Sequence, residues 1–381
     1  MASTPHPETG DPTTGDPTTG DPTTGDPTTG GPSVVGARSS ARRQWTVMGI
    51  VAVLLVAVVV LVLTVVVPGT GGLVSEPSPS RTILPRKTAA AAFPGGLARQ
   101  PPAQNRPGMQ EVAARDRGDT GTADEIARIA DQPIATWLTS SSVASTVRTV
   151  DAVVANAEQA GKTPVFVLYD IPDRDCGSYS GGGNSMREYI PWVRAVARAM
   201  RGSHAVVLVE PDSIAQISNC KRLEHGRIPL LRQAVAALSG HGLTVYLDGG
   251  NENRVPVGTM ATRLREAGVD DTQGFFTNVS NFYGVDPERS YADELSDRIG
   301  GDPHFVIDVS RNGTGWHGTW CNPPGAGLGQ TPRVTGGTTR LDALLWVKTP
   351  GLSDGTCNGG PAAGQWWESY ALDLVANRKQ G

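Results

Sequence analysis

The chain has 381 residues and a formal net charge of -4 at neutral pH. This length corresponds to one large domain or two medium-sized ones, and the slightly acidic balance argues against a nucleic-acid-binding protein, which needs a concentrated basic surface. The six histidines and four cysteines form no H-x-H, H-E-x-x-H or C-x-x-C pattern, so we expect neither a metal ion nor a cofactor.

The N-terminal hundred residues differ in composition from the rest of the chain. Residues 10–30 repeat the sequence G-D-P-T-T, and repeats of this kind bury too little apolar surface to fold. Residues 1–44 are therefore predicted to form a disordered tail. The stretch from Val47 to Val67 that follows carries no charge and has 21 residues, enough for a helix to cross a bilayer core of about 30 Å.

Arginines precede this apolar stretch, at positions 38, 42 and 43. By the positive-inside rule they keep the N-terminus in the cytoplasm and place the rest of the chain outside the cell. Residues 45–67 are thus predicted to be a transmembrane signal-anchor in the cell membrane. A cleaved signal peptide, which would make the protein secreted, is the alternative. Residues 68–106, rich in Pro, Gly, Ser and Ala, are predicted to be a flexible linker.

All four cysteines lie beyond the apolar stretch. An even number of cysteines on the exported side favours two disulfides in an oxidising compartment, and four buried free thiols are the alternative. The cysteines are Cys176, Cys220, Cys321 and Cys357.

Residues 107–381 have the composition of a globular domain. Short apolar runs recur about every 30–40 residues, which is the length of one strand-plus-helix unit. Between them lie helical patterns, such as Ile190, Val193 and Ala197 within Met186–Met200. Continuous apolar strands alternating with helices predict an α/β fold with a parallel sheet, and this many units favours a closed barrel. The apolar runs are Val165–Leu168, Val206–Val209, Thr244–Leu247, Phe275–Asn278, Phe305–Asp308 and Leu344–Val347.

Polar side chains follow most of these predicted strands. A single aspartate after a strand is usually a helix cap. Several of them after successive strands converge on one face of a barrel, where barrel enzymes place their catalytic groups. The residues are Asp170, Asp175, Asp212, Asp248, Asn281, Ser310 and Asp354.

The local sequences around these residues resemble glycoside hydrolase family 6. Residues 165–183, V-F-V-L-Y-D-I-P-D-R-D-C-G-S-Y-S-G-G-G, and residues 208–214, L-V-E-P-D-S-I, are similar to the two signatures of that family. Further similar segments follow in the same order and extend the resemblance from about residue 125 to 377. They are Y-L-D-G-G at 246–250, N-V-S-N-F at 278–282, W-C-N-P-P-G at 320–325, W-V-K at 346–348 and S-D-G-T-C-N-G-G-P-A-A-G-Q-W-W at 353–367.

The resemblance implies a distorted, TIM-like parallel β/α barrel with fewer than eight strands. It also implies hydrolysis of β-1,4-glucosidic bonds with inversion at the anomeric carbon, and disulfides Cys176–Cys220 and Cys321–Cys357. Inverting hydrolysis needs a protonated carboxyl that donates to the leaving oxygen and a basic group that activates water on the opposite face of the sugar.

By resemblance, Asp212 is the general acid and Asp175 is a second aspartate whose charge keeps Asp212 protonated. Asp354 matches the residue usually proposed as the base. That role is disputed in the family, and the alternative is transfer of the proton through a chain of waters, to which Ser178 or Ser180 would contribute here. Tyr169 matches the tyrosine that distorts the bound ring. For Asp175 a salt bridge to Arg174 is the alternative, and for Tyr169 ordinary packing is.

The resemblance also assigns residues to substrate binding. Asp248 matches an aspartate that binds sugar at the cleavage site, Lys348 a donor to sugar hydroxyls and Trp320 a stacking platform. A solvated charge is the alternative for Lys348. Arg174, in R-D-C, and Asn281, in N-V-S-N-F, complete this set.

Three departures from the family pattern lie near the predicted site. Gly249 and Asn251 stand where the family usually has Ala and His in Y-L-D-A-G-H. The tryptophans that often follow are replaced by residues 252–255, E-N-R-V, and Leu352 replaces a common glutamate. We therefore expect weaker sugar contacts beyond the cleavage point.

The segments Ser310–Cys321 and Asp354–Trp366 are short, which predicts an open cleft and an endo-acting enzyme. A cellobiohydrolase and a surface glucan-binding protein with little turnover are the alternatives. The expected partners are β-1,4-glucan chains and, through the N-terminal helix, a membrane. We expect a monomer.

Overall fold

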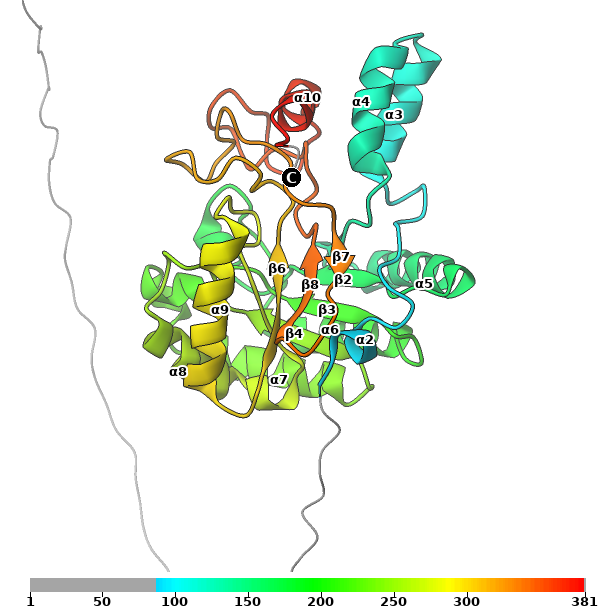
Figure 1. The fold of residues 1–381 in the computed structure, drawn as a ribbon. Coiled ribbons are helices and arrows are strands. Elements are labelled where there is room, and N and C mark those ends of the chain that lie inside the picture. Colours follow the sequence, from blue (N-terminus) through cyan, green and yellow to red (C-terminus); the bar gives the residue numbers. More distant parts are fainter. Residues whose placement is uncertain (1–86, 380–381) are drawn as a thin grey trace, which may run out of the picture. The chain divides into compact units, whose positions relative to one another are not determined.

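The computed structural model describes residues 87–379 (Figure 1). The predicted tail, the predicted transmembrane segment 45–67 and residues 68–86 of the predicted linker lie outside the described residues. Within residues 87–379, no helix is long and apolar enough to cross a membrane.

One curled sheet of eight strands forms the centre of the fold, in the order β1-β2-β3-β4-β5-β6-β8-β7. All neighbouring strands are parallel except β7 and β8, which are antiparallel. A parallel bridge between Ile134 and Trp346 links the start of β1 to the end of β8. The strands are β1 Thr136–Leu138, β2 Val165–Leu168, β3 Val206–Val209, β4 Thr244–Asp248, β5 Gly274–Thr277, β6 His304–Asp308, β7 Arg333–Val334 and β8 Leu341–Leu345.

The α/β architecture with a parallel sheet, predicted from the sequence, is confirmed as a curled sheet. The closed, TIM-like barrel that was also predicted stays a prediction. The predicted count of fewer than eight strands holds for the seven parallel strands but is wrong for the whole sheet. The additional strand is β7, which has two residues: Arg333 is exposed and Val334 is partly buried. Such a short edge strand carries no apolar run, so its sequence gives no strand signal.

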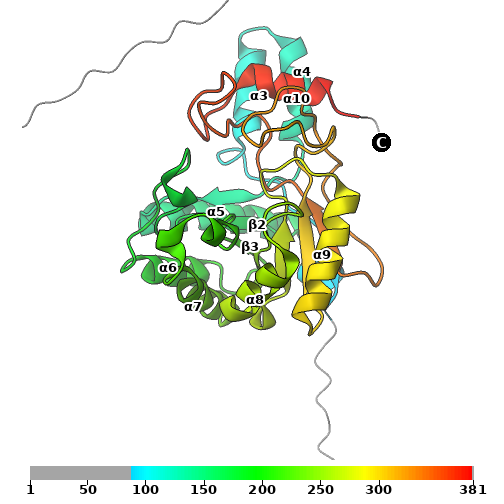
Figure 2. The same ribbon diagram turned by 90° about the vertical axis from the view of Figure 1, so that its left-hand side faces the viewer.

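Helices α5 to α9 alternate with the strands and surround the sheet (Figure 2). In α6 the residues predicted to share one face, Ile190, Val193 and Ala197, are all buried, as the helical spacing requires. The helices are α2 Ala89–Ala92, α3 Arg106–Asp116, α4 Thr120–Ala130, α5 Val143–Ala160, α6 Tyr189–Ala199, α7 Arg227–Ser239, α8 Val257–Ala267, α9 Val285–Ile299 and α10 Glu368–Ala376.

Strands β2, β3, β5, β6 and β8 are buried on both faces, which explains their continuous apolar sequences. In β2, Phe166 and Leu168 belong to the large core between the sheet and the helices. Val165 and Val167 belong to a second core on the inner face of the curled sheet, together with Tyr246 and residues of four further strands.

Residues 87–106, the last part of the predicted linker, are packed on the α/β domain. Lys87 Nζ donates hydrogen bonds to the carbonyl oxygens of Thr272 (2.7 Å) and Gln273 (3.1 Å). Phe93 is buried against Tyr246, with ring centroids 6.3 Å apart. The folded domain therefore includes residues before position 107.

The hairpin α3–α4 and helix α10 lie beyond the carboxyl ends of β6 and β8 (Figures 1 and 2). An ion pair of 2.8 Å between Arg117 and Glu368 connects the hairpin to α10. The carboxyl ends of the strands thus carry most of the irregular chain, and the predicted site residues lie there.

Candidate active site

A cleft of about 750 Å³ opens at the carboxyl ends of the strands. Most of the residues predicted to form the site line it, although they come from segments spread over nearly 190 positions of the chain. These lining residues are Tyr169, Arg174, Asp175, Asp212, Asn281, Trp320, Lys348 and Asp354. Asp248 is not among the lining residues.

Two of the cleft carboxylates project from strained backbone. Asp212 has φ 67° and Asp175 has φ 55°, in the left-handed region that residues with a Cβ rarely occupy. Neither is a glycine, so the surrounding structure must stabilise both turns. Strain of this kind concentrates at functional sites, where it fixes the direction of a side chain.

Asp212 lies in a surrounding that favours its neutral form. Its side chain is 29% exposed and faces the cleft. Burial raises the pKa of Asp212 to about 6. The Arg254 guanidinium, with Nη1 3.4 Å from Asp212 Oδ1, opposes this shift, and the charges of Asp248 and Asp175 add to it. In mildly acidic solution Asp212 is therefore protonated and able to donate a proton.

Asp175 is held by two hydrogen bonds. Its Oδ2 accepts from the backbone N–H of Ser180 (2.9 Å), and its Oδ1 accepts from Gln216 Nε2 (2.9 Å). The neighbouring Arg174 turns elsewhere: its guanidinium donates to the carbonyl oxygens of Tyr169 and Ser180 and lies 3.6 Å from Asp170. Asp175 and Arg174 therefore do not form the salt bridge that was the alternative for Asp175.

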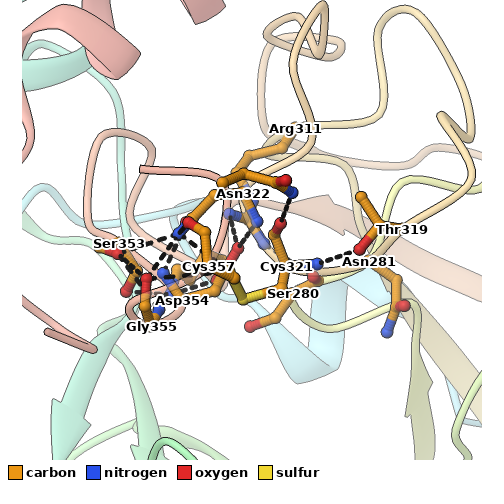
Figure 3. Close-up of polar contacts among 12 residues, drawn as sticks. Ser280, Asn281, Arg311, Thr319, Cys321, Asn322, Ser353, Asp354, Gly355 and Cys357 are labelled. Carbon is orange, nitrogen blue, oxygen red and sulfur yellow. Dashed lines mark hydrogen bonds and ion pairs between the residues drawn. A yellow bond between two sulfur atoms is a disulfide. The ribbon is translucent and has the colours of Figure 1, made fainter. Parts of the chain in front are cut away.

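Asp354 is a buried carboxylate with two cationic partners (Figure 3). Arg311 Nη1 lies 2.8 Å from one carboxylate oxygen and Lys348 Nζ 2.8 Å from the other. The backbone N–H of Asn322 donates to it as well, at 3.0 Å. Although burial opposes ionisation, Arg311 and Lys348 together lower the pKa of Asp354 to about 2. A carboxylate in this state is a weak proton acceptor.

Asp248 is buried beneath the cleft. Its Oδ2 accepts from the backbone N–H groups of Ile214 (3.0 Å) and Ala215 (3.1 Å), and its Oδ1 from that of Gly250 (2.9 Å). These bonds hold the turn that carries Asp212. We therefore interpret Asp248 as a residue that positions Asp212, whereas the sequence predicted direct contact with sugar.

Both predicted disulfides are present. Cys176–Cys220 and Cys321–Cys357 each have a Cα–Cα distance of 6.2 Å, and no cysteine of residues 87–379 is free. The alternative of four free thiols is excluded. Cys321 and Cys357 connect the loop of Trp320 to the loop of Asp354 beside the cleft (Figure 3). Within residues 87–379, no group of three or more His, Cys, Asp or Glu residues is placed to hold a metal ion.

The model of the family described as Glycosyl hydrolases family 6 matches residues 100–378. The chain belongs to this family. It is 44% identical over 253 residues to Endoglucanase A of Cellulomonas fimi, which is 66% of this chain and 56% of that protein. It is 38% identical over 275 residues to Endoglucanase 1 of Streptomyces halstedii, covering 69% of this chain and 84% of that protein. The chain thus spans about half the length of the Cellulomonas relative.

A solved structure of the same family has a similar fold. The endoglucanase Cel6 from Mycobacterium tuberculosis, in complex with methyl-cellobiosyl-4-deoxy-4-thio-β-D-cellobioside, has a TM-score of 0.70 and 38% sequence identity. The similarity covers 76% of this chain and 99% of that chain.

Aromatic side chains line the family 6 cleft at several points. Tyr169 packs edge-on against Trp137, with ring centroids 5.1 Å apart, and the Arg174 guanidinium lies 4.9 Å from the Tyr169 ring centroid. Trp320 is 42% exposed and lies 6.1 Å from Tyr179, which is 48% exposed. Flat apolar faces of this kind suit the C–H faces of pyranose rings.

Three residues that depart from the family pattern are Gly249, which the structure explains, and Asn251 and Leu352, which it places. A Cβ at Gly249 would lie 2.8 Å from the Phe275 ring and 2.9 Å from the Phe276 carbonyl oxygen, so alanine does not fit here without a shift. Asn251 is buried, and its Oδ1 accepts from the backbone N–H of Asn253 (3.1 Å), so it shapes a loop. Leu352 lines the cleft.

Four residues at the site were missed from the sequence: Trp137, Gln216, Arg254 and Arg311. Trp137 lies in the three-residue strand β1, which is too short to give a periodic signal. Arg311 is fully buried against Asp354, and arginine is usually an exposed residue, so its sequence gives no indication of this role. The contacts of Gln216 and Arg254 with aspartates join separate loops.

Proposed function

We propose that the chain is an endo-acting hydrolase of β-1,4-glucosidic bonds in cellulose or a related β-glucan, with inversion at the anomeric carbon. The observation that carries this proposal is Asp212, a cleft-facing carboxyl whose pKa is raised to about 6 by burial. A general acid needs this property, because it must hold a proton and release it to the leaving oxygen at the pH of the reaction.

Asp175 supports the same mechanism. It lies in the same cleft, and its charge helps to keep Asp212 protonated and favours the positive charge that develops on the sugar ring. Its two recorded hydrogen bonds occupy one lone pair on each oxygen, which leaves further acceptor capacity.

The proton of the attacking water has a poor acceptor in Asp354, because Arg311 and Lys348 hold its pKa at about 2. We infer that this proton passes through water toward Asp175, along the side of the cleft that Ser178 and Ser180 line. Asp354 then acts by keeping Lys348 and the loop of Asn322 in place.

Exposed aromatics at the rim support endo action. Trp320 and Tyr179 are each more than two-fifths exposed, and Trp316, in the same loop as Trp320, is 43% exposed. Loops that covered the cleft as a tunnel would bury these rings. An open cleft binds the middle of a chain as well as its end.

Carboxymethyl cellulose tests this proposal and its alternatives. An endo-acting enzyme lowers the viscosity of the polymer strongly for each reducing end that it releases. A cellobiohydrolase releases reducing ends with little change in viscosity. A glucan-binding protein releases none, which would refute the proposal.

We further propose that residues 45–67 anchor a monomeric protein in the cell membrane, with residues 87–379 outside the cell. The two disulfides support the outer location, since such bonds persist in oxidising compartments. Proteolysis of intact cells tests this topology: it should release the folded domain while residues 1–44 stay protected. Sedimentation of the released domain measures its oligomeric state.

A further inference from the structure

Arg254 brings a positive charge next to the proposed general acid. Its Nη1 lies 3.4 Å from Asp212 Oδ1, its side chain is 30% exposed, and it lines the cleft. A guanidinium has five N–H donors. Within residues 87–379, the guanidinium of Arg254 makes the ion pair with Asp212 and no other hydrogen bond or ion pair, so it has N–H donors without a protein partner.

The loop that carries Arg254 is braced. The backbone N–H of Arg254 donates to the carbonyl oxygen of Asn251 (3.2 Å), and the backbone N–H of Glu252 donates to Glu288 Oε1 (2.9 Å). Glu288 and Val255 are buried. The guanidinium is therefore presented from a fixed position, as a binding residue requires.

The proposed role of Asp212 as general acid fixes where Arg254 lies relative to the bound substrate. A general acid must reach the oxygen of the bond that breaks, within about 3 Å. A group 3.4 Å from that acid consequently lies next to the scissile bond. A neutral glucan offers Arg254 only hydroxyl groups, whereas a carboxylate on the sugar accepts two parallel N–H bonds with opposite charge.

The lining of the cleft, taken as a whole, does not repel a carboxylate on the substrate. Its lining carboxylates are Asp175, Asp212 and Asp354, and its lining cations are Arg106, Arg174, Arg254 and Lys348. Asp354 is also compensated by the buried Arg311, which does not line the cleft. The titratable groups whose charges interact with the Asp212–Arg254 pair are Tyr169, Asp175, Asp248 and Tyr283. Glu252 and Glu288 interact in turn with Tyr283.

We propose that Arg254 forms a subsite for a carboxylate substituent on a sugar next to the scissile bond, so that the preferred substrate is an acidic β-1,4-glucan. This inference rests on the proposed function. In the free protein Arg254 pairs with Asp212 and stabilises its ionised, inactive form. A substrate carboxylate competes for the guanidinium, so binding of an acidic substrate also favours the protonated acid.

The test compares two polymers with the same backbone and degree of substitution, carboxymethyl cellulose and hydroxyethyl cellulose. The quantity is the ratio of kcat/KM on the acidic polymer to that on the neutral one. We expect Arg254→Gln to lower this ratio about tenfold, which corresponds to about 1.4 kcal/mol. Arg254→Lys, which keeps the charge but loses the paired geometry, should retain an intermediate ratio.

Arg106→Gln is the matched control, because it removes an equal charge from another exposed residue of the cleft lining. We expect it to change the ratio less than about twofold, since separated exposed charges are screened by salt. An unchanged ratio in Arg254→Gln, or an equal fall in Arg106→Gln, would overturn the subsite. If the wild type hydrolyses neither polymer, the proposed function itself fails. This outcome differs from the two that would overturn the subsite.

Discussion

Asp212 and Asp354 line the same cleft and differ in almost everything that surrounds them. Asp212 is partly exposed, has one arginine at 3.4 Å and lies near two further carboxylates, and its pKa is raised to about 6. Asp354 is buried, contacts Arg311 and Lys348 at 2.8 Å, and its pKa is lowered to about 2.

The comparison separates the effect of burial on the pKa of an aspartate from the effect of neighbouring charges. Burial raises the pKa of both aspartates, and only the second cation and the shorter distances reverse the shift at Asp354. We therefore propose that one residue type serves in two ways, as a proton donor at Asp212 and as a lasting negative charge at Asp354. The following predictions test this division.

The largest effect is expected at the acid. Asp212→Asn removes the proton donor and should lower kcat on β-glucans with poor leaving groups about 10²–10⁴-fold. Oligosaccharide affinity, measured by calorimetry, should change little, because the amide keeps the shape of the side chain. Near-normal turnover in a folded variant would contradict the assignment.

At Asp354 the main effect is expected on stability. Asp354→Asn leaves Arg311 and Lys348 buried without their carboxylate, which should lower the free energy of unfolding by about 3–5 kcal/mol. Urea denaturation at pH 7 measures this loss. Lys348→Met is the control: Asp354 then keeps Arg311, so its loss should be smaller.

The pH dependence of the Asp354 group has a definite sign. Because its folded-state pKa is below the ordinary value of 3.8, its stabilisation is present above about pH 3.8 and is lost as the pH falls toward 2. Asp354→Asn should abolish this part of the acid sensitivity. Equal acid sensitivity in wild type and variant would show that the carboxylate is not paired in solution.

Arg254 allows a test of the charge on Asp212. On a neutral cello-oligosaccharide, kcat/KM of the wild type should fall as the pH rises through about 6, where Asp212 loses its proton. Because the Arg254 guanidinium lowers the pKa of Asp212, Arg254→Gln should move this fall to higher pH. An unchanged pH profile would mean that the two side chains do not interact in the folded enzyme.

The smallest effect is expected at Glu288, which braces the Arg254 loop. Burial raises the pKa of this carboxyl to about 7, above its ordinary 4.5, so stability is lost as the pH rises from about 4.5 to 7. Glu288→Gln cannot ionise. Its free energy of unfolding should exceed that of the wild type by on the order of 2 kcal/mol at pH 8, and differ little at pH 4.5. Urea denaturation at both values checks this.

Six strands of the sheet, β2 to β6 and β8, and most of the charged residues of the cleft could be predicted from the sequence alone. Strands buried on both faces must be continuously apolar, so runs such as Val206–Val209 can be recognised in the sequence. The motif that contains Asp212 could also be recognised in the sequence, because its residues are consecutive. Residues 1–86 are a different case: the predicted tail, the predicted membrane segment and residues 68–86 of the predicted linker stay predictions.

Which charged side chains meet became known from the folded structure and not from the sequence. Arg311 is 43 positions from Asp354 in the chain, and the pairing of Arg254 with Asp212 likewise joins two loops that follow different strands. The structure also shows that Asp248 accepts hydrogen bonds from the turn after Asp212 and that residues 87–106 pack on the folded domain. Electrostatic shifts depend on distances of 3–4 Å and on burial, and a residue's neighbours in sequence fix neither of these when the contact joins separate loops.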